Sequence, residues 1–154
     1  MNGEQVIGVI PNCTSGVLGG KSYNLIVTNH RLIIAQLTSQ MIKDGAAMIS
    51  QQSKQSGEGR FKRMMSTMTS GQNLYQRYFN MNPQDAVMET PGNFFVDLYQ
   101  IRSAKVKTGG WDEDGKDPNE LKLKWDGGKI VLRFSSISGS EAKNLLSRVL
   151  PNVK

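Results

Sequence analysis

Reactive side chains are scarce in this chain of 154 residues, which has one cysteine, Cys13, and one histidine, His30. A single cysteine excludes a disulfide within the chain and a thiolate metal cluster. His30 has no second histidine to join and no cysteine or carboxylate beside it in sequence, so we expect a turn residue and neither a general base nor a metal ligand. Cys13 has no catalytic motif near it. We therefore expect a protein that is not an enzyme and has no cofactor or metal site.

Long apolar runs are missing as well. No run approaches the roughly 18–20 residues that a membrane-spanning helix needs. The first residues, MNGEQVIGVIPN, have neither a basic segment nor the long apolar core of a signal peptide, and no lipidation motif stands out. We therefore expect a soluble, cytoplasmic protein.

Charge is present in excess of one sign. The chain has 19 lysines and arginines against 13 acidic residues, a net charge of +6. This sign favours anionic partners such as lipid headgroups, nucleic acid or acidic proteins, although such a charge can also serve solubility alone. The length suits one domain spanning residues 1–154, and neither an internal repeat nor a linker divides it.

The clearest structural pattern is a hairpin in YNLIVTNHRLIIA, residues 23–35. Two apolar strands are separated by two residues, the first of them an asparagine. This spacing pairs Val27 with Leu32, Ile26 with Ile33 and Leu25 with Ile34. Side chains alternate along a strand, so Ile26 and Ile33 lie on the face opposite to the other four. Both faces are apolar and must be covered.

Helical spacing dominates the middle of the chain, from about residue 39 to 91. Phe61, Met64, Met65 and Met68 form an apolar stripe in a basic, Met-rich segment. A short helix is expected after Asn82, which can cap it, with Pro83 at its first position and Pro91-Gly92 at its end. We expect this helical block to cover the Ile26 and Ile33 face.

Strand patterns occupy both flanks of the block. A first strand is expected from Gln5 to Ile10, closed by Pro11, and a turn-rich stretch follows. After the block, residues 94–106 alternate, with a bend. LKLKW, residues 121–125, then forms a hairpin with residues 130–136, and its DGGK turn is expected to place a glycine at positive φ.

A single helix is expected at the end of the chain. Ser138 and Glu141 have capping-box spacing, and Pro151 stops the helix. Its apolar stripe consists of Ala142, Leu145, Leu146 and Val149. The pattern predicts an α+β fold: a mostly antiparallel sheet or small barrel with one closing helix.

Two segments look like known ligand loops and fail on spacing. SGVLGGKS, residues 15–22, has Ser15 where a phosphate loop needs glycine, and a strand pattern follows where a helix is needed. The glycine-rich loop with Lys21 could still meet an anion. The acidic stretch 112–120 has its glycine at the fourth position of a calcium loop and not at the sixth, so we expect a solvated loop.

The hairpin resembles a signature of the pleckstrin-homology-like (PH-like) superfold, in its GRAM and bacterial PH branches. Thr28, Asn29, Arg31 and Leu32 match the hairpin, and Ile101 with residues 104–106 fits a later strand. The resemblance covers about residues 3–38 and 93–150, and the block at about 40–90 would be an insertion. It implies a partly open barrel with a C-terminal capping helix and a non-enzymatic module for phosphoinositides or proteins. In such domains the loop that holds Lys21 is a common headgroup site.

Candidate ligand-binding residues follow from charge and position: Lys21, Arg31, Arg60, Lys62 and Arg63. For Arg31 a structural role in the hairpin is the competing interpretation. Basic charge beside a methionine stripe suits an anionic membrane surface or a protein partner. A second hypothesis is an interaction or self-association module that uses the helical block. Nucleic-acid binding through lysine and arginine clusters is a third and weaker hypothesis, because basic residues alternate with acidic ones and no aromatic-basic RNA signature is present.

Overall fold

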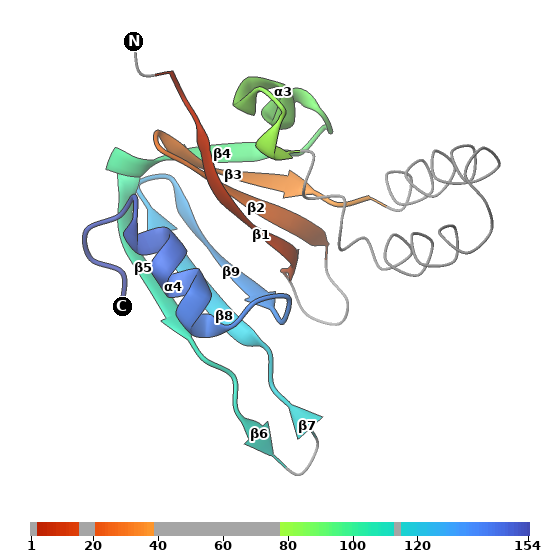
Figure 1. The fold of residues 1–154 in the computed structure, drawn as a ribbon, viewed down its shortest axis with the longest axis vertical. Coiled ribbons are helices and arrows are strands. Elements are labelled where there is room, and N and C mark those ends of the chain that lie inside the picture. The colour runs from red at the N-terminus through yellow and green to blue at the C-terminus, as the bar shows by residue number, and fades with distance from the viewer. Residues whose placement is uncertain (1–2, 16–20, 39–77, 113–114) are drawn as a thin grey trace, which may run out of the picture.

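The computed structural model describes residues 3–15, 21–38, 78–112 and 115–154. Seven strands form one antiparallel sheet, and a C-terminal helix, α4 (Gly139–Ser147), lies across β5, β8 and β9 (Figure 1). The α+β class and the single closing helix are therefore confirmed. In sheet order the strands are β4 (Phe94–Asp97), β3 (Arg31–Gln36), β2 (Ser22–Thr28), β1 (Val6–Thr14), β9 (Gly128–Phe134), β8 (Asn119–Trp125) and β5 (Ile101–Lys107).

The β2–β3 hairpin has the register that its sequence predicts. Val27 lies opposite Leu32, Ile26 opposite Ile33 and Leu25 opposite Ile34, and all six side chains are fully buried. The pairs with Leu25 and Val27 belong to the main core, which α4 covers, and the pair of Ile26 and Ile33 belongs to a smaller core on the opposite face. The alternation of one hairpin thus feeds two separate hydrophobic clusters.

The smaller core is covered by residues from the C-terminal end of the predicted helical block. Tyr78 and Ala86 are buried against Ile26 and Ile33, and Ala86 belongs to α3 (Pro83–Met88). The Asn82 side chain caps α3 by accepting a hydrogen bond from the Gln84 amide at 2.9 Å, as predicted. The rest of the block, residues 39–77 with the Met-rich basic segment, lies outside the described residues.

The terminal helix docks as its sequence pattern predicts. The Ser138 hydroxyl accepts a hydrogen bond from the Glu141 amide at 3.1 Å, and Ala142 and Leu146 are completely buried in the main core. After Pro151 the chain runs beside the outer edge of β5, where Val153 forms a parallel bridge with Ala104. The last residues therefore satisfy backbone groups that would otherwise be free on the sheet edge.

The prediction that Pro11 closes the first strand is wrong. β1 continues to Thr14, because the irregularity between Ile10 and Cys13 absorbs the proline, which has no amide to donate. Asn12 takes a positive φ of 54° there, and its amide donates to the Asn24 side chain at 3.2 Å. The Cys13 thiol at this bulge is fully buried and donates to the Ile10 carbonyl.

The expected positive φ in the β8–β9 turn is also wrong. The turn does connect the two strands through two residues, since Trp125 pairs with Gly128, but Gly92 has the one positive φ among the described glycines. The two glycines instead leave room for the Trp125 indole, which would have to shift by a few tenths of an ångström for a larger residue. A Cβ atom on Gly127 would lie 3.2 Å from the Trp125 indole nitrogen, and one on Gly128 would lie 3.3 Å from the indole ring.

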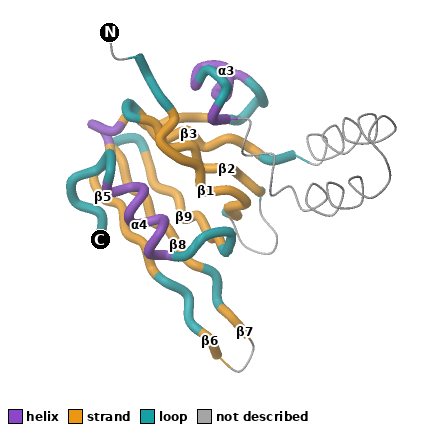
Figure 2. The backbone as a smooth tube through the Cα atoms, viewed as in Figure 1, coloured by secondary structure: helices purple, strands orange, loops and turns teal. Residues whose placement is uncertain are grey.

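The bend predicted in residues 94–106 is one 3-10 turn, η2 (Leu98–Gln100), between β4 and β5. Beyond β5 and before β8 the chain forms an arm that projects from the body and carries two short strands, β6 (Trp111–Asp112) and β7 (Gly115–Lys116) (Figure 2). None of the described helices is sufficiently long and apolar to cross a membrane.

The base of this arm offers a test of its backbone packing. A Cβ atom on Gly109 would overlap the Asp117 carbonyl oxygen, whereas one on Gly110 would meet nothing within 4 Å. We expect Gly109→Ala to lower the free energy of unfolding by about 1–3 kcal/mol, because backbone must move, and Gly110→Ala to be nearly neutral. Chemical denaturation of the two variants measures this difference, and equal effects would contradict the packing at the arm's base.

Candidate functional site: a basic sheet face

The tip of the β2–β3 hairpin is held by a hydrogen-bond network centred on Thr28. The Thr28 hydroxyl accepts hydrogen bonds from the amides of His30 and Arg31 at 3.1 and 2.9 Å. The same oxygen lies 2.8 Å from Glu4 Oε1 and 2.9 Å from the Arg31 carbonyl, and it can donate its proton to either. The exposed His30 is the turn residue that its sequence position predicts.

The Arg31 guanidinium is held by a carboxylate of the chain itself. Its Nε and Nη2 atoms lie 2.7 and 3.0 Å from the two carboxylate oxygens of Glu4, and the group stacks 4.5 Å from the centre of the Phe95 ring. Both side chains are largely buried, with 11% and 17% exposed. In this bidentate geometry the fork that would clasp a phosphate is already occupied.

The pairing with Arg31 changes the pKa of Glu4. Burial alone would raise the pKa of its carboxyl group, but hydrogen bonds from Arg31 and Thr28 and the positive charges of Arg31 and His30 outweigh burial and lower the pKa. The Glu4 carboxyl group is therefore charged at neutral pH and balances the charge of Arg31. The ion pair ties the segment before β1 to the hairpin.

The other candidate residues are placed as follows. Lys21 is exposed directly before β2, and its carbonyl accepts a hydrogen bond from the Ser15 amide at 3.1 Å. The neighbouring Thr14 pairs with Arg133 of β9, so Lys21 lies near the end of β9. Arg60, Lys62 and Arg63 lie outside the described residues.

One open hollow of about 690 Å³ lies between residues 3–6 and residues 79–83. The charged side chain in its lining is Glu4, whose charge Arg31 already balances. Phe79 lies at this hollow with about half of its surface exposed. Among the residues that the structure describes, the lining of this hollow therefore offers no positive charge for the anionic partner that the composition favours.

The face of β5, β8 and β9 that points away from α4 is strongly cationic. On β8, Leu121 and Leu123 are buried in the main core, whereas Lys122 and Lys124 are exposed on the other side. β5 and β9 alternate in the same way, so their outward residues align with those of β8. We name the nine outward positions the basic face: Ser103, Lys105, Lys107, Glu120, Lys122, Lys124, Lys129, Val131 and Arg133.

The basic face is a three-by-three lattice with six cations and one carboxylate, a net charge of +5. Directly opposite side chains on neighbouring strands have Cβ atoms about 5 Å apart. Lys105 lies opposite Lys122, and Lys124 lies opposite Lys129, so like charges face each other twice. Like-charge pairs of this kind destabilise a sheet, so their presence on an exposed face favours a role in binding an anionic partner over a role in stability.

Glu120 neutralises one end of the lattice. Its carboxylate oxygens lie 3.5 Å from Arg133 Nε and 3.6 Å from Lys122 Nζ, and Lys107 is its cross-strand neighbour. Lys105, Lys124 and Lys129 remain without an acidic neighbour on the face. The end with Ser103, Lys124 and Lys129 therefore carries the least compensated charge.

The sequence contains a signal for this face that charge counting alone misses. LKLKW alternates leucine and lysine, which places two lysines on the outer side of one strand. The lysines of β5 are 15 or more residues away, and only the strand pairing brings Lys105 beside Lys122. The charge of the face thus arises from register, which the sequence of one strand does not contain.

Chemistry at other positions finds no support among the residues that the structure describes. Within those ranges no three His, Cys, Asp or Glu side chains gather closely enough to hold a metal ion. Burial raises the pKa of the Cys13 thiol to about 12, so the sulfur stays protonated and poorly nucleophilic. Comparison with known proteins finds no matching family model, no matching curated protein and no matching solved structure.

Proposed function

We propose that the chain is a non-enzymatic binding module of the PH-like superfold, in its GRAM or bacterial PH branch, and that its partner is anionic. The hairpin residues that carry the resemblance lie at the β2–β3 turn, and the antiparallel order with a C-terminal helix is compatible with that fold. The expected cytoplasmic location belongs to the same proposal.

One observation carries the proposal: the basic face concentrates a net charge of +5 on three strands. Lys105, Lys124 and Lys129 are exposed and have no acidic neighbour among the nine positions of the basic face, so their charges are available to a partner. An anionic partner would relieve the repulsion between opposed lysines, and it would gain from every cation at once.

A titration with inorganic polyphosphate tests this function without assuming the natural partner. Lys105→Gln combined with Lys124→Gln should weaken binding about tenfold at low salt, since exposed ion pairs are each worth up to about 1 kcal/mol. Binding by the unchanged protein should weaken steeply as salt rises.

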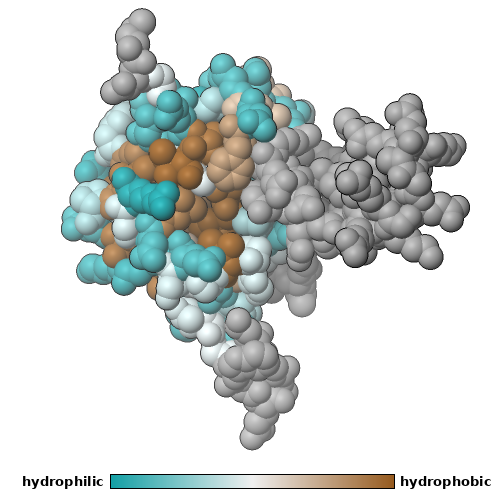
Figure 3. Space-filling model, viewed as in Figure 1, coloured by the Kyte–Doolittle hydropathy of each residue, from teal (hydrophilic) through white to brown (hydrophobic). Residues whose placement is uncertain are grey.

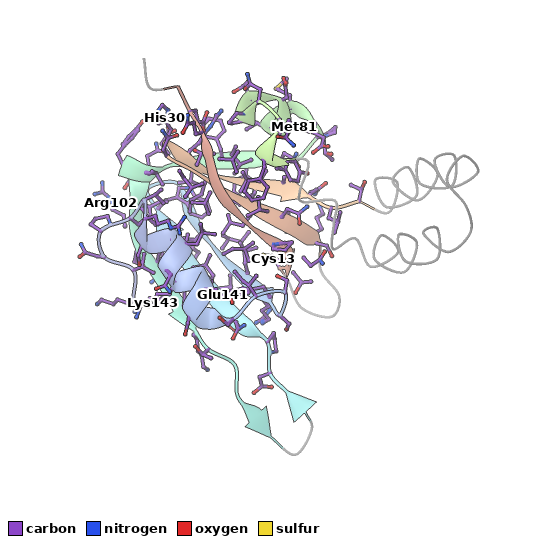
Figure 4. All side chains as sticks on the ribbon, in the orientation of Figure 1. Cys13, His30, Met81, Arg102, Glu141 and Lys143 are labelled. Carbon is purple, nitrogen blue, oxygen red and sulfur yellow. The ribbon has the colours of Figure 1, made fainter. Side chains whose placement is uncertain are left out.

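The matched control removes two charges from the opposite side of the molecule. Lys143 and Arg148 are exposed at the outer side of α4 and at its end, and Figure 4 shows Lys143 projecting away from the sheet. Lys143→Gln with Arg148→Gln should bind polyphosphate nearly as well as the unchanged protein. Equal losses in both double variants, or no binding at low salt, would rule out the basic face as the binding site.

Self-association through the Met-rich segment is the second hypothesis from the sequence. Its residues lie outside the described part of the chain, so no contact or exposed surface of that segment supports or opposes it. Lys21 remains a proposed contributor to anion binding from the loop before β2.

A further inference from the structure

We infer that the basic face docks flat on the surface of an anionic lipid bilayer and does not select a particular headgroup. The inference rests on the proposed function, because it names the partner of the same face. The contact would be electrostatic and spread over several lysines, with no single pocket.

Geometry favours a planar partner. Outward side chains on one strand recur about every 7 Å, and neighbouring strands lie about 5 Å apart, so the nine positions cover a patch of roughly 10 by 14 Å. All of them project from the same side of one antiparallel sheet. A flat anionic surface can meet every cation together, whereas the rounded backbone of a nucleic-acid duplex would meet them along one line.

The side-chain chemistry points the same way. Five of the six cations are lysines, which are compact point charges and lack the planar fork with which arginine selects a phosphate. None of the nine positions is aromatic, so the face offers no platform for stacked bases. Cross-strand neighbours project side by side and do not converge on one point, so no single headgroup is enclosed.

The opposite side of the molecule has a different character. Figure 3 shows apolar residues gathered over β1, between α3 and α4, on the side that carries α4. There Leu145 of α4 packs over Gly8 and stays partly exposed. A bilayer on the basic face would leave α4 and this apolar surface directed away from the lipid.

Reversing the charge of selected lysines on the basic face should weaken binding without lowering the stability of the fold. Lys105 and Lys124 each lie opposite another lysine, so glutamate at either position turns a repulsive pair into an attractive one. The double variant Lys105→Glu, Lys124→Glu should therefore have a melting temperature equal to or above that of the unchanged protein. A loss of binding in this variant would not be a loss of fold.

Sedimentation with vesicles tests the inference. The unchanged protein should bind phosphatidylcholine vesicles that contain phosphatidylglycerol or phosphatidylserine at equal mole fraction, with equal affinity for both. It should not bind phosphatidylcholine alone, and high salt should release it. Each charge near an anionic surface contributes about fivefold in affinity, so the double reversal, which changes four charge units, should cost more than a hundredfold.

The control is Lys143→Glu with Arg148→Glu, which changes the net charge equally on the α4 side and should lose far less binding. Equal losses in the two double variants would overturn the inference. So would a strong preference between the two anionic lipids, since it would require headgroup recognition. Binding to polyphosphate or duplex DNA without binding to vesicles would overturn the bilayer as partner and leave the proposed function standing. Failure of polyphosphate and vesicle binding together would overturn both.

Discussion

Replacing Leu146 by alanine should lower the free energy of unfolding by about 3 kcal/mol. Leu146 is completely buried where α4 meets the sheet, in the same cluster as Leu121 and Phe134. Truncation would remove buried apolar surface and leave a cavity that a sheet fixed by its hydrogen-bonded register can fill only in part. Denaturant unfolding followed by circular dichroism measures the change.

The neighbouring leucine is the control for this substitution. Leu145 is only partly buried, over the backbone of Gly8, so Leu145→Ala should cost about 1 kcal/mol. If the two truncations cost the same, α4 would not be docked through Leu146. The comparison thus tests which face of the C-terminal helix points into the core.

The second large effect concerns the ion pair between Glu4 and Arg31. Arg31→Met should lower the free energy of unfolding by about 2 kcal/mol at neutral pH, between the values for exposed and fully buried pairs. The methionine would retain apolar contact with Phe95 but would leave the Glu4 carboxylate partly buried, with Thr28 as its remaining partner among the described residues. Thermal and denaturant unfolding measure this cost.

Acid should weaken the same contact. The pKa of Glu4 is lowered in the folded protein, so the unfolded chain binds a proton more readily. The stabilising effect is present above the unfolded pKa, near 4.5, and is lost as pH falls through the lower folded value. Glu4→Gln should be less stable at neutral pH and should lose less stability on acidification. An identical pH slope in the two proteins would contradict the coupling.

Local patterns predicted those parts of the fold in which neighbours in sequence are neighbours in space. A two-residue turn sets the register of the β2–β3 hairpin, and the N-cap Ser138 sets the start of α4. Pro11 misled the prediction because proline breaks a regular strand but fits a bulge, and the bulge depends on Asn24 in the next strand.

The candidate site was harder to predict because its charges meet through pairing between distant strands. Charge and position single out Arg31, whose guanidinium is bound to Glu4, a residue 27 positions earlier that no local pattern connects with it. The lysines of the basic face, by contrast, are not singled out by the sequence. Each of these lysines looks like an ordinary solvent-facing residue until β5, β8 and β9 lie side by side.

The rate at which the buried thiol of Cys13 is modified should report how often the sheet opens around it. The sulfur lies at the bulge of β1 with no surface exposed, and its pKa of about 12 keeps it protonated. An alkylating reagent therefore has to wait until β1 separates from its neighbours. Because Cys13 is the chain's single cysteine, each modified molecule has undergone one such opening. The opening of the central strand of the sheet can therefore be measured without an added label.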